Sequence, residues 1–147
     1  MTDKHKASEA ARERLRAVGL RPTRQRLALA KLLFAGPHRH VSAEQLHGEA
    51  LRKKVRVSLA TVYNTLHQFT EAGILRELVI DPGRSYFDTN VTHHHHFFFE
   101  GSTRLRDIPG EGVEVKRLPA APEGTEVARV DVIIRLKDSP KRRKRSS

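Results

Sequence analysis

The most informative segment for the fold is SLATVYNTLHQFTEAGILRELVIDPGRSYFDT, residues 58–89. Ser58 is a favourable helix N-cap, apolar residues then recur at three- and four-residue spacing, and Gly73 ends the predicted helix. Two β-rich runs follow within residues 74–89 and flank the turn Asp81-Pro-Gly-Arg84, a pattern that predicts a β-hairpin. The chain therefore passes directly from an amphipathic helix into a two-stranded ribbon.

Three further helices are predicted before this stretch. The first covers residues 7–18, and the second begins at Thr23 and ends before Gly36. The third begins at Ser42, which forms a capping box with Gln45. Four helices and then a hairpin is the order of a winged helix-turn-helix, in which the third helix supports the fourth and the fourth enters the major groove of DNA. The alternative is a helical bundle with a β-appendage.

A second, mainly β region is predicted after His93. Three runs have strand character, namely residues 97–99, 103–108 and 127–136. Prolines at 119 and 122 forbid a long helix between the last two runs. We therefore predict an α+β chain with three parts: an N-terminal winged helix-turn-helix over 1–90, a small mainly β dimerisation and sensing domain over 91–138, and a basic disordered tail over 139–147.

Positive charge is concentrated in the first part and in the tail. The formal net charge is +11; residues 1–92 hold 16 Lys and Arg against 9 Asp and Glu, and the tail sequence KRRKR at 141–145 adds +5. A basic module indicates a polyanionic partner, most often nucleic acid, whereas the alternative is a solubilising surface. The tail is expected to add non-specific phosphate contacts.

Composition excludes several kinds of site. The 147 residues include no cysteine, so any metal site must use His and carboxylates. No apolar run approaches the ~20 residues that span a bilayer, and the charged first 18 residues do not resemble a secretory signal. We therefore expect a cytoplasmic protein with no membrane partner. Two small domains also bury little apolar area each, which favours a partner subunit.

A run of four histidines is the most informative feature of the second region. Alternation along a strand places His94 and His96 on one face, and His93 and His95 on the other. Two imidazoles need further ligands to hold a metal. The candidates are Asp88, Asp107 and, if folding brings it close, His40. Such a set suits Zn(II), Fe(II), Mn(II) or Co(II) without choosing among them.

The same run supports other interpretations. Imidazoles beside Phe97-Phe98-Phe99 could provide an axial ligand and an apolar surface for haem, or the run could be inert. A zinc enzyme would need a general base and an open ligand position, and the sequence contains no H-E-x-x-H and no nucleophile motif, so we expect no enzymatic activity. A nucleic-acid architectural protein without a sensing role is a third class.

Several motifs in one order resemble those of ferric-uptake-regulator (Fur) proteins. They are HVSAEQL at 40–46, LATVYNTLHQFTEAGI at 59–74, and the D-x5-H-x-H pattern that runs from Asp88 to His96. The resemblance covers roughly residues 10–108. It implies a sequence-specific transcriptional regulator, commonly a repressor, that acts as a homodimer on a pseudo-palindromic, AT-rich operator in double-stranded DNA.

The resemblance also implies ligands. The family's regulatory metal, Fe, Mn or Zn, is held by residues that match His40, Asp88, His94, His96 and Asp107 in this sequence. A second set, for metal or haem, would be His93, His95 and Glu114. The first two cysteine positions of the family's structural zinc site are Phe99 and Ser102 here, so that site is absent. The family's long dimerisation helix is replaced by the proline-interrupted segment 112–122.

One subfamily shares further features with this sequence. The cysteine-free core, the segment HHFFFE at 95–100 and the ending EVARVDVIIRL at 126–136 resemble the iron response regulator (Irr) subfamily. That resemblance implies control of iron and haem homeostasis genes in response to metal or haem. The alternative is another Fur-family repressor that senses iron, manganese, zinc or peroxide.

Candidate DNA-contacting residues lie on the fourth predicted helix and before the second. The early solvent-facing residues Ser58, Thr61 and Asn64 are predicted to contact bases or phosphates. Tyr63 and Arg21 match DNA-contacting positions of the family, although the spacing of Tyr63 also permits a core role and Arg21 could be an ordinary solvated residue.

Overall fold

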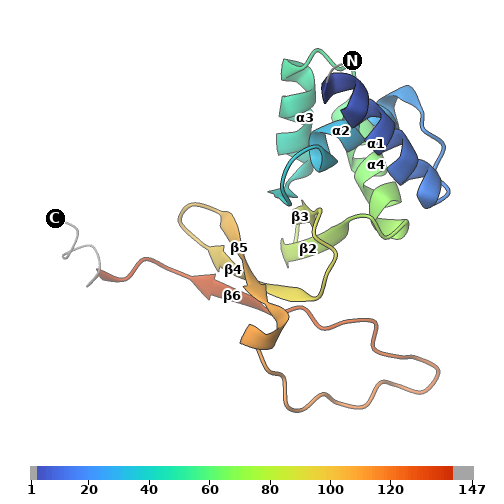
Figure 1. The fold of residues 1–147 in the computed structure, drawn as a ribbon. Helices are drawn as coiled ribbons and strands as arrows, with labels where there is room; N and C mark the ends of the chain where they lie inside the picture. The colour runs from blue at the N-terminus through green and yellow to red at the C-terminus, as the bar shows by residue number, and fades with distance from the viewer. Residues whose placement is uncertain (1–2, 141–147) are drawn as a thin grey trace. The chain divides into compact units, whose positions relative to one another are not determined.

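The structure, a computed structural model, describes residues 3–140. The chain forms two compact units, and the boundary between them falls between Val91 and Thr92 (Figure 1). The predicted basic tail lies, from residue 141 onward, outside the described residues. No helix in the described part of the chain is long and apolar enough to cross a membrane.

Local signals account for the four helices of the first unit. They are α1 (Asp3–Ala17), α2 (Arg24–Phe34), α3 (Ala43–Arg52) and α4 (Leu59–Glu71). The predicted N-caps Thr23, Ser42 and Ser58 each accept a hydrogen bond from a backbone N–H three residues later, which satisfies a donor that the helix leaves unpaired. Gly73 has a φ of +85°, a left-handed conformation that lets the chain leave α4. The predicted helices are confirmed, although α1 begins earlier than residue 7.

The helices of the first unit enclose one apolar core. Its side chains recur at helical spacing, so that each helix turns one stripe inward. Its largest fully buried members are Phe69, Phe87, Leu15, Leu29, Leu33, Leu46 and Leu66. Tyr63 is half-buried at the edge of this cluster.

The predicted hairpin follows α4 as β2 (Arg76–Asp81) and β3 (Arg84–Asp88). A third strand, β1 (His40–Val41), pairs with β3 on the other side and opposes His40 to Asp88. This arrangement of four helices and a hairpin is a winged helix-turn-helix, as predicted. The two-residue strand β1 was not predicted, because it is too short to carry a periodic signal.

The second unit is a three-stranded sheet in the order β5-β4-β6. β4 (His94–Phe99) pairs antiparallel with β5 (Arg104–Pro109) and parallel with β6 (Ile133–Leu136). The predicted strands at 97–99 and 103–108 are confirmed, and most of the histidine run is itself strand. Between the short 3-10 turn Gly110–Gly112 and β6, the chain has neither helix nor strand (Figure 1).

The expected ten-residue strand over 127–136 is wrong, because only its last four residues form strand β6. The reason lies at Val132, whose N–H donates to the Nδ1 atom of His95 at 3.1 Å. A side chain therefore takes the backbone donor that would continue the ladder. The residues before Val130 are exposed, so no apolar burial extends the strand.

Candidate metal centre and nucleic-acid surface

One face of β4 presents two imidazoles to one carboxylate. The Nε2 atoms of His94 and His96 lie 3.6 and 3.4 Å from Oδ1 of Asp107. The sheet register explains the geometry, since His96 is directly opposite Asp107 on β5 and His94 lies two residues earlier on the same face. The histidines are 3% and 1% exposed, and the three ligand atoms lie within 4.8 Å of one another. Two nitrogens and an oxygen at this spacing can bind a divalent metal.

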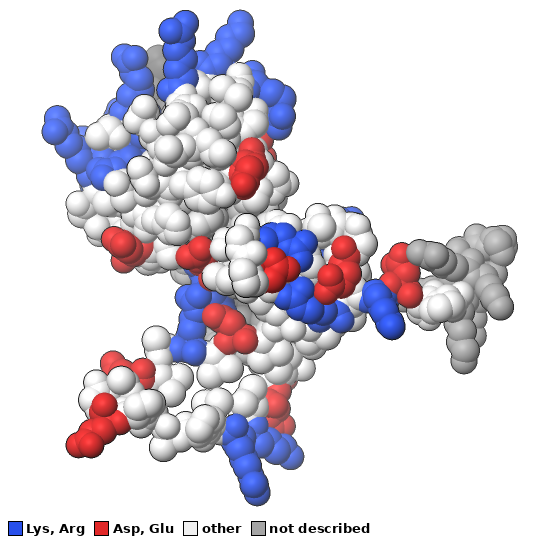
Figure 2. Space-filling view, turned by 180° about the vertical axis from the view of Figure 1, so that it is seen from behind, with Lys and Arg blue, Asp and Glu red and all other residues white. Residues whose placement is uncertain are grey.

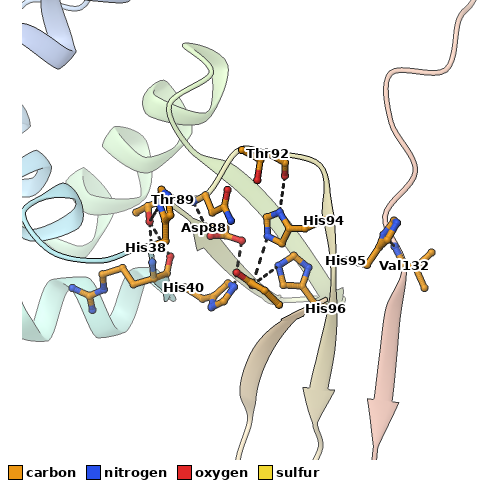
Figure 3. Close-up of polar contacts among 12 residues, drawn as sticks. His38, His40, Asp88, Thr89, Thr92, His94, His95, His96 and Val132 are labelled. Carbon is orange, nitrogen blue, oxygen red and sulfur yellow. Dashed lines mark hydrogen bonds and ion pairs between the residues drawn. The ribbon is translucent and has the colours of Figure 1, made fainter. Parts of the chain in front are cut away.

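The ring of His94 is held in one orientation and one tautomer. Its Nδ1 atom lies 2.6 Å from the carbonyl oxygen of Thr92 (Figure 3). A carbonyl only accepts, so Nδ1 carries the proton and the neutral ring has its lone pair on Nε2, the atom that faces Asp107. Metal-binding histidines are commonly oriented by such a hydrogen bond from the other ring nitrogen. The donor set of the second unit therefore fits a metal ion.

A second histidine and carboxylate pair lies in the first unit. Nε2 of His40 is 3.3 Å from Oδ2 of Asp88, because β1 and β3 oppose these residues. The other oxygen of Asp88 accepts from the N–H of Asn90 at 2.9 Å. Asp88 is fully buried, and a buried carboxylate requires such partners. This pair offers one nitrogen and one oxygen ligand.

The chain beside His40 is anchored to two helices and to the end of β3. The guanidinium of Arg39 donates both to the carboxylate of Glu49 on α3 and to the carbonyl of Leu32 on α2. The backbone N–H of Arg39 donates to Oγ1 of Thr89 at 2.9 Å, and the N–H of Thr89 donates to the Arg39 carbonyl at 3.0 Å. We call Arg39, Glu49 and Thr89 the Arg39 clasp. It connects the residue next to His40 with the helical core.

On the other face of β4, His95 holds the backbone of a neighbouring strand. His95 is 2% exposed, and its Nδ1 accepts the Val132 N–H that holds the start of β6. The neutral ring therefore carries its proton on Nε2. His93 is exposed, and its ring centroid lies 5.0 Å from that of His95. Glu114 is exposed, and within the described residues no hydrogen bond or ion pair joins its carboxylate to either ring.

Most predicted DNA contacts on α4 already have intramolecular partners. Oγ of Ser58 accepts from the Thr61 N–H and donates to the Thr61 hydroxyl, at 3.1 and 3.0 Å. The Tyr63 hydroxyl donates to the carboxylate of Glu44 at 2.9 Å, and this hydrogen bond raises the pKa of Tyr63 above its usual value. Asn64 is exposed. Tyr63 thus combines the packing role with a polar group at the surface.

The positive side chains nearest in sequence to α4 precede the helix and do not lie on it. The helix Leu59–Glu71 contains neither Lys nor Arg. Exposed cations lie at the end of α3 and in the connection that leads into α4: Arg52, Lys53, Lys54 and Arg56. Arg21 is also exposed, before α2, and its carbonyl accepts from the Arg26 guanidinium. Figure 2 shows Lys and Arg gathered over one end of the helical unit. Such a surface suits a phosphate backbone.

The family model of the ferric uptake regulators matches residues 17–135. The chain belongs to the ferric uptake regulator (Fur) family. The ferric uptake regulation protein of Shigella flexneri is 38% identical over 80 residues, 54% of each chain. The peroxide-responsive repressor PerR of Staphylococcus epidermidis is 34% identical over 94 residues, 64% of this chain and 62% of that protein. The chain thus spans about half the length of the ferric uptake regulation proteins it matches.

Solved structures of Fur proteins have the same fold. The ferric uptake regulator of Pseudomonas aeruginosa with manganese has a TM-score of 0.67 at 24% identity, over 87% of this chain and 97% of that one. The regulator of Vibrio cholerae has a TM-score of 0.67 at 21% identity, over 86% and 98%. At these identities the likeness establishes the architecture alone.

Sequence reasoning on this Fur chain missed the supporting contacts. Thr92 acts through its backbone carbonyl, which has no sequence signal. Thr89 bonds to the backbone of Arg39, 50 positions away in the sequence. The partner of Tyr63 is Glu44, in the first turn of α3. An acidic residue is favoured there by the helix dipole alone, so its presence only weakly indicated a hydrogen bond to Tyr63. Only the fold showed that these groups hold the predicted residues in place.

Proposed function

We propose that this Fur-family chain is a sequence-specific DNA-binding transcriptional regulator, a repressor in the family's usual mode, whose DNA affinity depends on a divalent metal. One observation carries the proposal: the buried histidines of β4 meet Asp107, and the His94 tautomer keeps the lone pair on Nε2, the atom on that side. Metal-binding histidines are commonly oriented by a hydrogen bond from the other ring nitrogen, as His94 is here.

The ligands implied by the family resemblance form two sets, one in each unit. The first unit contributes the pair His40 and Asp88, and the second contributes His94, His96 and Asp107. We propose that one ion takes ligands from both sets. Binding would then select one arrangement of the two units, and in a dimer one spacing of the two α4 helices. DNA affinity would follow that spacing, because half-sites lie at fixed separation.

The donor types suit Fe(II), Mn(II) or Zn(II), the ions that the family resemblance implies. Three imidazoles with two carboxylates form a nitrogen and oxygen set, which all three accept, and the absence of thiolate ligands removes the preference for softer ions. Relatives are described with manganese and with iron, which agrees with this range. The bound ion would join the ligands of the first unit to those of the second.

Haem is a second candidate effector, and the iron response regulator resemblance points to iron and haem homeostasis genes as targets. The observation that favours it is the exposed His93 beside an aromatic strand in which Phe97 and Phe99 remain half-buried. Use of His95 would require its ring to leave the Val132 N–H. The set His93, His95 and Glu114 remains a prediction. Hemin should produce a Soret band that shrinks when residues 93–96 are replaced by Ala.

We further propose that the chain acts as a homodimer on a pseudo-palindromic, AT-rich operator. The winged helix and its exposed cations support the DNA partner, and the small apolar interior of the second unit supports a partner subunit. Two copies related by a twofold axis would present two α4 helices to two half-sites.

Operator binding by the full chain tests this proposal. Metal-free, metal-loaded and hemin-treated protein are titrated onto a selected operator at one salt concentration, since salt alone changes such affinities. We expect metal to raise affinity by about tenfold or more, a coupling typical of allosteric proteins. The variant His94→Ala/His96→Ala should lose that dependence, and His5→Ala, an exposed histidine on α1, should keep it. Unchanged metal titrations in the double variant would refute the metal site.

A further inference from the structure

A small cavity lies between α1 and α2, where the two helices pack against each other. Five alanines, three cationic side chains and Phe34 line it, and its volume is about 280 Å³. Because alanine methyl groups fill little space, the helices leave a hollow between them. Lys6, Ala10 and Arg14 are exposed at its edge, so the cavity opens to solvent.

The inner side of this cavity is apolar. Ala11 and Ala30 are buried and Phe34 is half-buried, so a ligand that enters meets methyl groups and an aromatic ring. Ligand sites commonly combine such an apolar wall with a few polar groups. A volume of about 280 Å³ lies just below the roughly 300–1,000 Å³ of pockets for drug-sized molecules, so the cavity suits a compound with a single small ring.

Arg14 places an oriented guanidinium at the edge of the cavity. Its Cζ atom lies 4.4 Å from the centroid of the Phe34 ring. Stacking on the ring fixes the plane of the guanidinium and leaves N–H groups at its edge. No ion pair or side-chain hydrogen bond joins Arg14 to another described residue. Its planar donors can therefore hold a carboxylate through two parallel hydrogen bonds.

Lys31 supplies a second cation from α2. Its Nζ atom donates to Oγ of Ser8 on α1 at 3.3 Å, and this contact holds the ammonium at the cavity. An ammonium carries three donors, so two remain for a ligand. Lys6 adds a third positive charge, and among the described residues that line the cavity none is acidic. The cavity therefore favours an anion.

We propose that this cavity binds a small monocarboxylate that carries one apolar ring. The carboxylate accepts hydrogen bonds from Arg14 and Lys31, and the ring packs against Ala11, Ala30 and Phe34. A phosphate would leave the apolar side uncovered, and a neutral ring would leave the cations unpaired, so the two features together select an amphipathic anion. The described residues that line the cavity include none of the proposed metal ligands and none of α4, so the inference is independent of the proposed function.

Titration of the full chain with benzoate, followed by calorimetry and by amide NMR spectra, tests the inference. Benzoate should shift the resonances of residues 6–14 and 30–35. It should bind at least about tenfold more tightly than acetate, which lacks the ring, or than benzyl alcohol and inorganic phosphate. Arg14→Gln should weaken benzoate binding by about 10- to 100-fold, the effect of losing hydrogen bonds between charged groups. Ala10→Leu should fill the opening and abolish binding without removing a charge.

The matched control is Arg12→Gln on the same helix, because Arg12 pairs with Glu9 and does not line the cavity. It should keep the wild-type affinity. Since Arg14 and Ala10 are exposed, their variants should keep the wild-type circular dichroism. The inference is wrong if acetate or phosphate binds as tightly as benzoate, if Arg12→Gln and Arg14→Gln weaken binding equally, or if Ala10→Leu binds like wild type. The absence of any shift in residues 6–14 and 30–35 at millimolar benzoate would also overturn it.

Discussion

The two units of this protein are built on different interiors. The first encloses an apolar cluster contributed by all four of its helices and its hairpin. In the described part of the second, Phe98 and Ile108 are the buried apolar side chains, while His94, His95 and His96 are buried as completely. Apolar burial stabilises without a partner, whereas each buried imidazole must be hydrogen-bonded or ligated. The first unit is therefore self-sufficient, and the second depends on its polar partners.

The largest expected effect comes from emptying the apolar core. Phe69→Ala removes a fully buried ring from α4 and should lower the free energy of unfolding by about 3–5 kcal/mol. Urea unfolding followed by far-ultraviolet circular dichroism measures it. The matched change Gln25→Ala, on the exposed side of α2, should stay within about 0.5 kcal/mol of wild type. A loss below about 1 kcal/mol in Phe69→Ala would mean that the first unit does not rest on this core.

Metal should have the next largest effect, and it should act first on the second unit. Zn(II) at about 100 times its dissociation constant should add about 2.7 kcal/mol to the free energy of unfolding. Hydrogen exchange should show the protection in residues 94–109, since β4 and β5 hold three of the proposed ligands. His94→Ala/His96→Ala should abolish the gain. Protection confined to α1 and α2 would mean that metal stabilises the first unit rather than the second.

The two faces of β4 permit a finer test within the second unit. His95→Phe keeps a ring but removes the acceptor of the Val132 N–H, which should cost about 1–3 kcal/mol and increase exchange in β6. His95→Asn offers an oxygen near the Nδ1 position and should retain part of that stability. Neither change should alter Zn(II) affinity at the His94 face. A loss of Zn(II) binding in His95→Asn would show that both faces serve one metal.

The sequence predicted the fold of the first unit well because its signals are local. Thr23, Ser42 and Ser58 cap helices through bonds three residues long, and the hairpin turn is specified by four adjacent residues. The second unit was predicted less accurately. The extent of β6 depends on a contact between His95 and Val132, 37 positions apart, which no local pattern contains.

In the candidate site, too, the features set by strand alternation could be predicted, whereas those set by contacts between distant segments could not. Strand alternation was enough to place His94 and His96 on one face, and the register of β4 against β5 brings Asp107 to them. The orientation of the His94 ring could not be predicted, since it depends on the backbone carbonyl of Thr92. The anchoring of His40 was also unpredictable, because it uses a two-residue strand and a salt bridge from Arg39 to α3.

The smallest expected effect on stability lies in the Arg39 clasp, which lies beside His40, the proposed metal ligand of the first unit. Glu49→Gln removes the charge opposite Arg39; the two side chains are 23% and 31% exposed, so solvent screening limits the loss to about 1 kcal/mol. Glu9→Gln, which breaks the more exposed pair with Arg12 on α1, should cost less than about 0.5 kcal/mol.

The clasp should matter more for the metal than for stability. Arg39 precedes His40 directly, so a loosened Arg39 allows the His40 ring to leave Asp88. Losing a residue that holds a metal ligand in place weakens metal binding by about 10- to 100-fold. Zn(II) titrations of Glu49→Gln and Glu9→Gln measure the difference. Equal affinities would mean that β1 alone positions His40 through its pairing with β3. If Glu49→Gln alone loses Zn(II) affinity, the first unit helps to position a proposed metal ligand through the ion pair between Arg39 and Glu49 on α3.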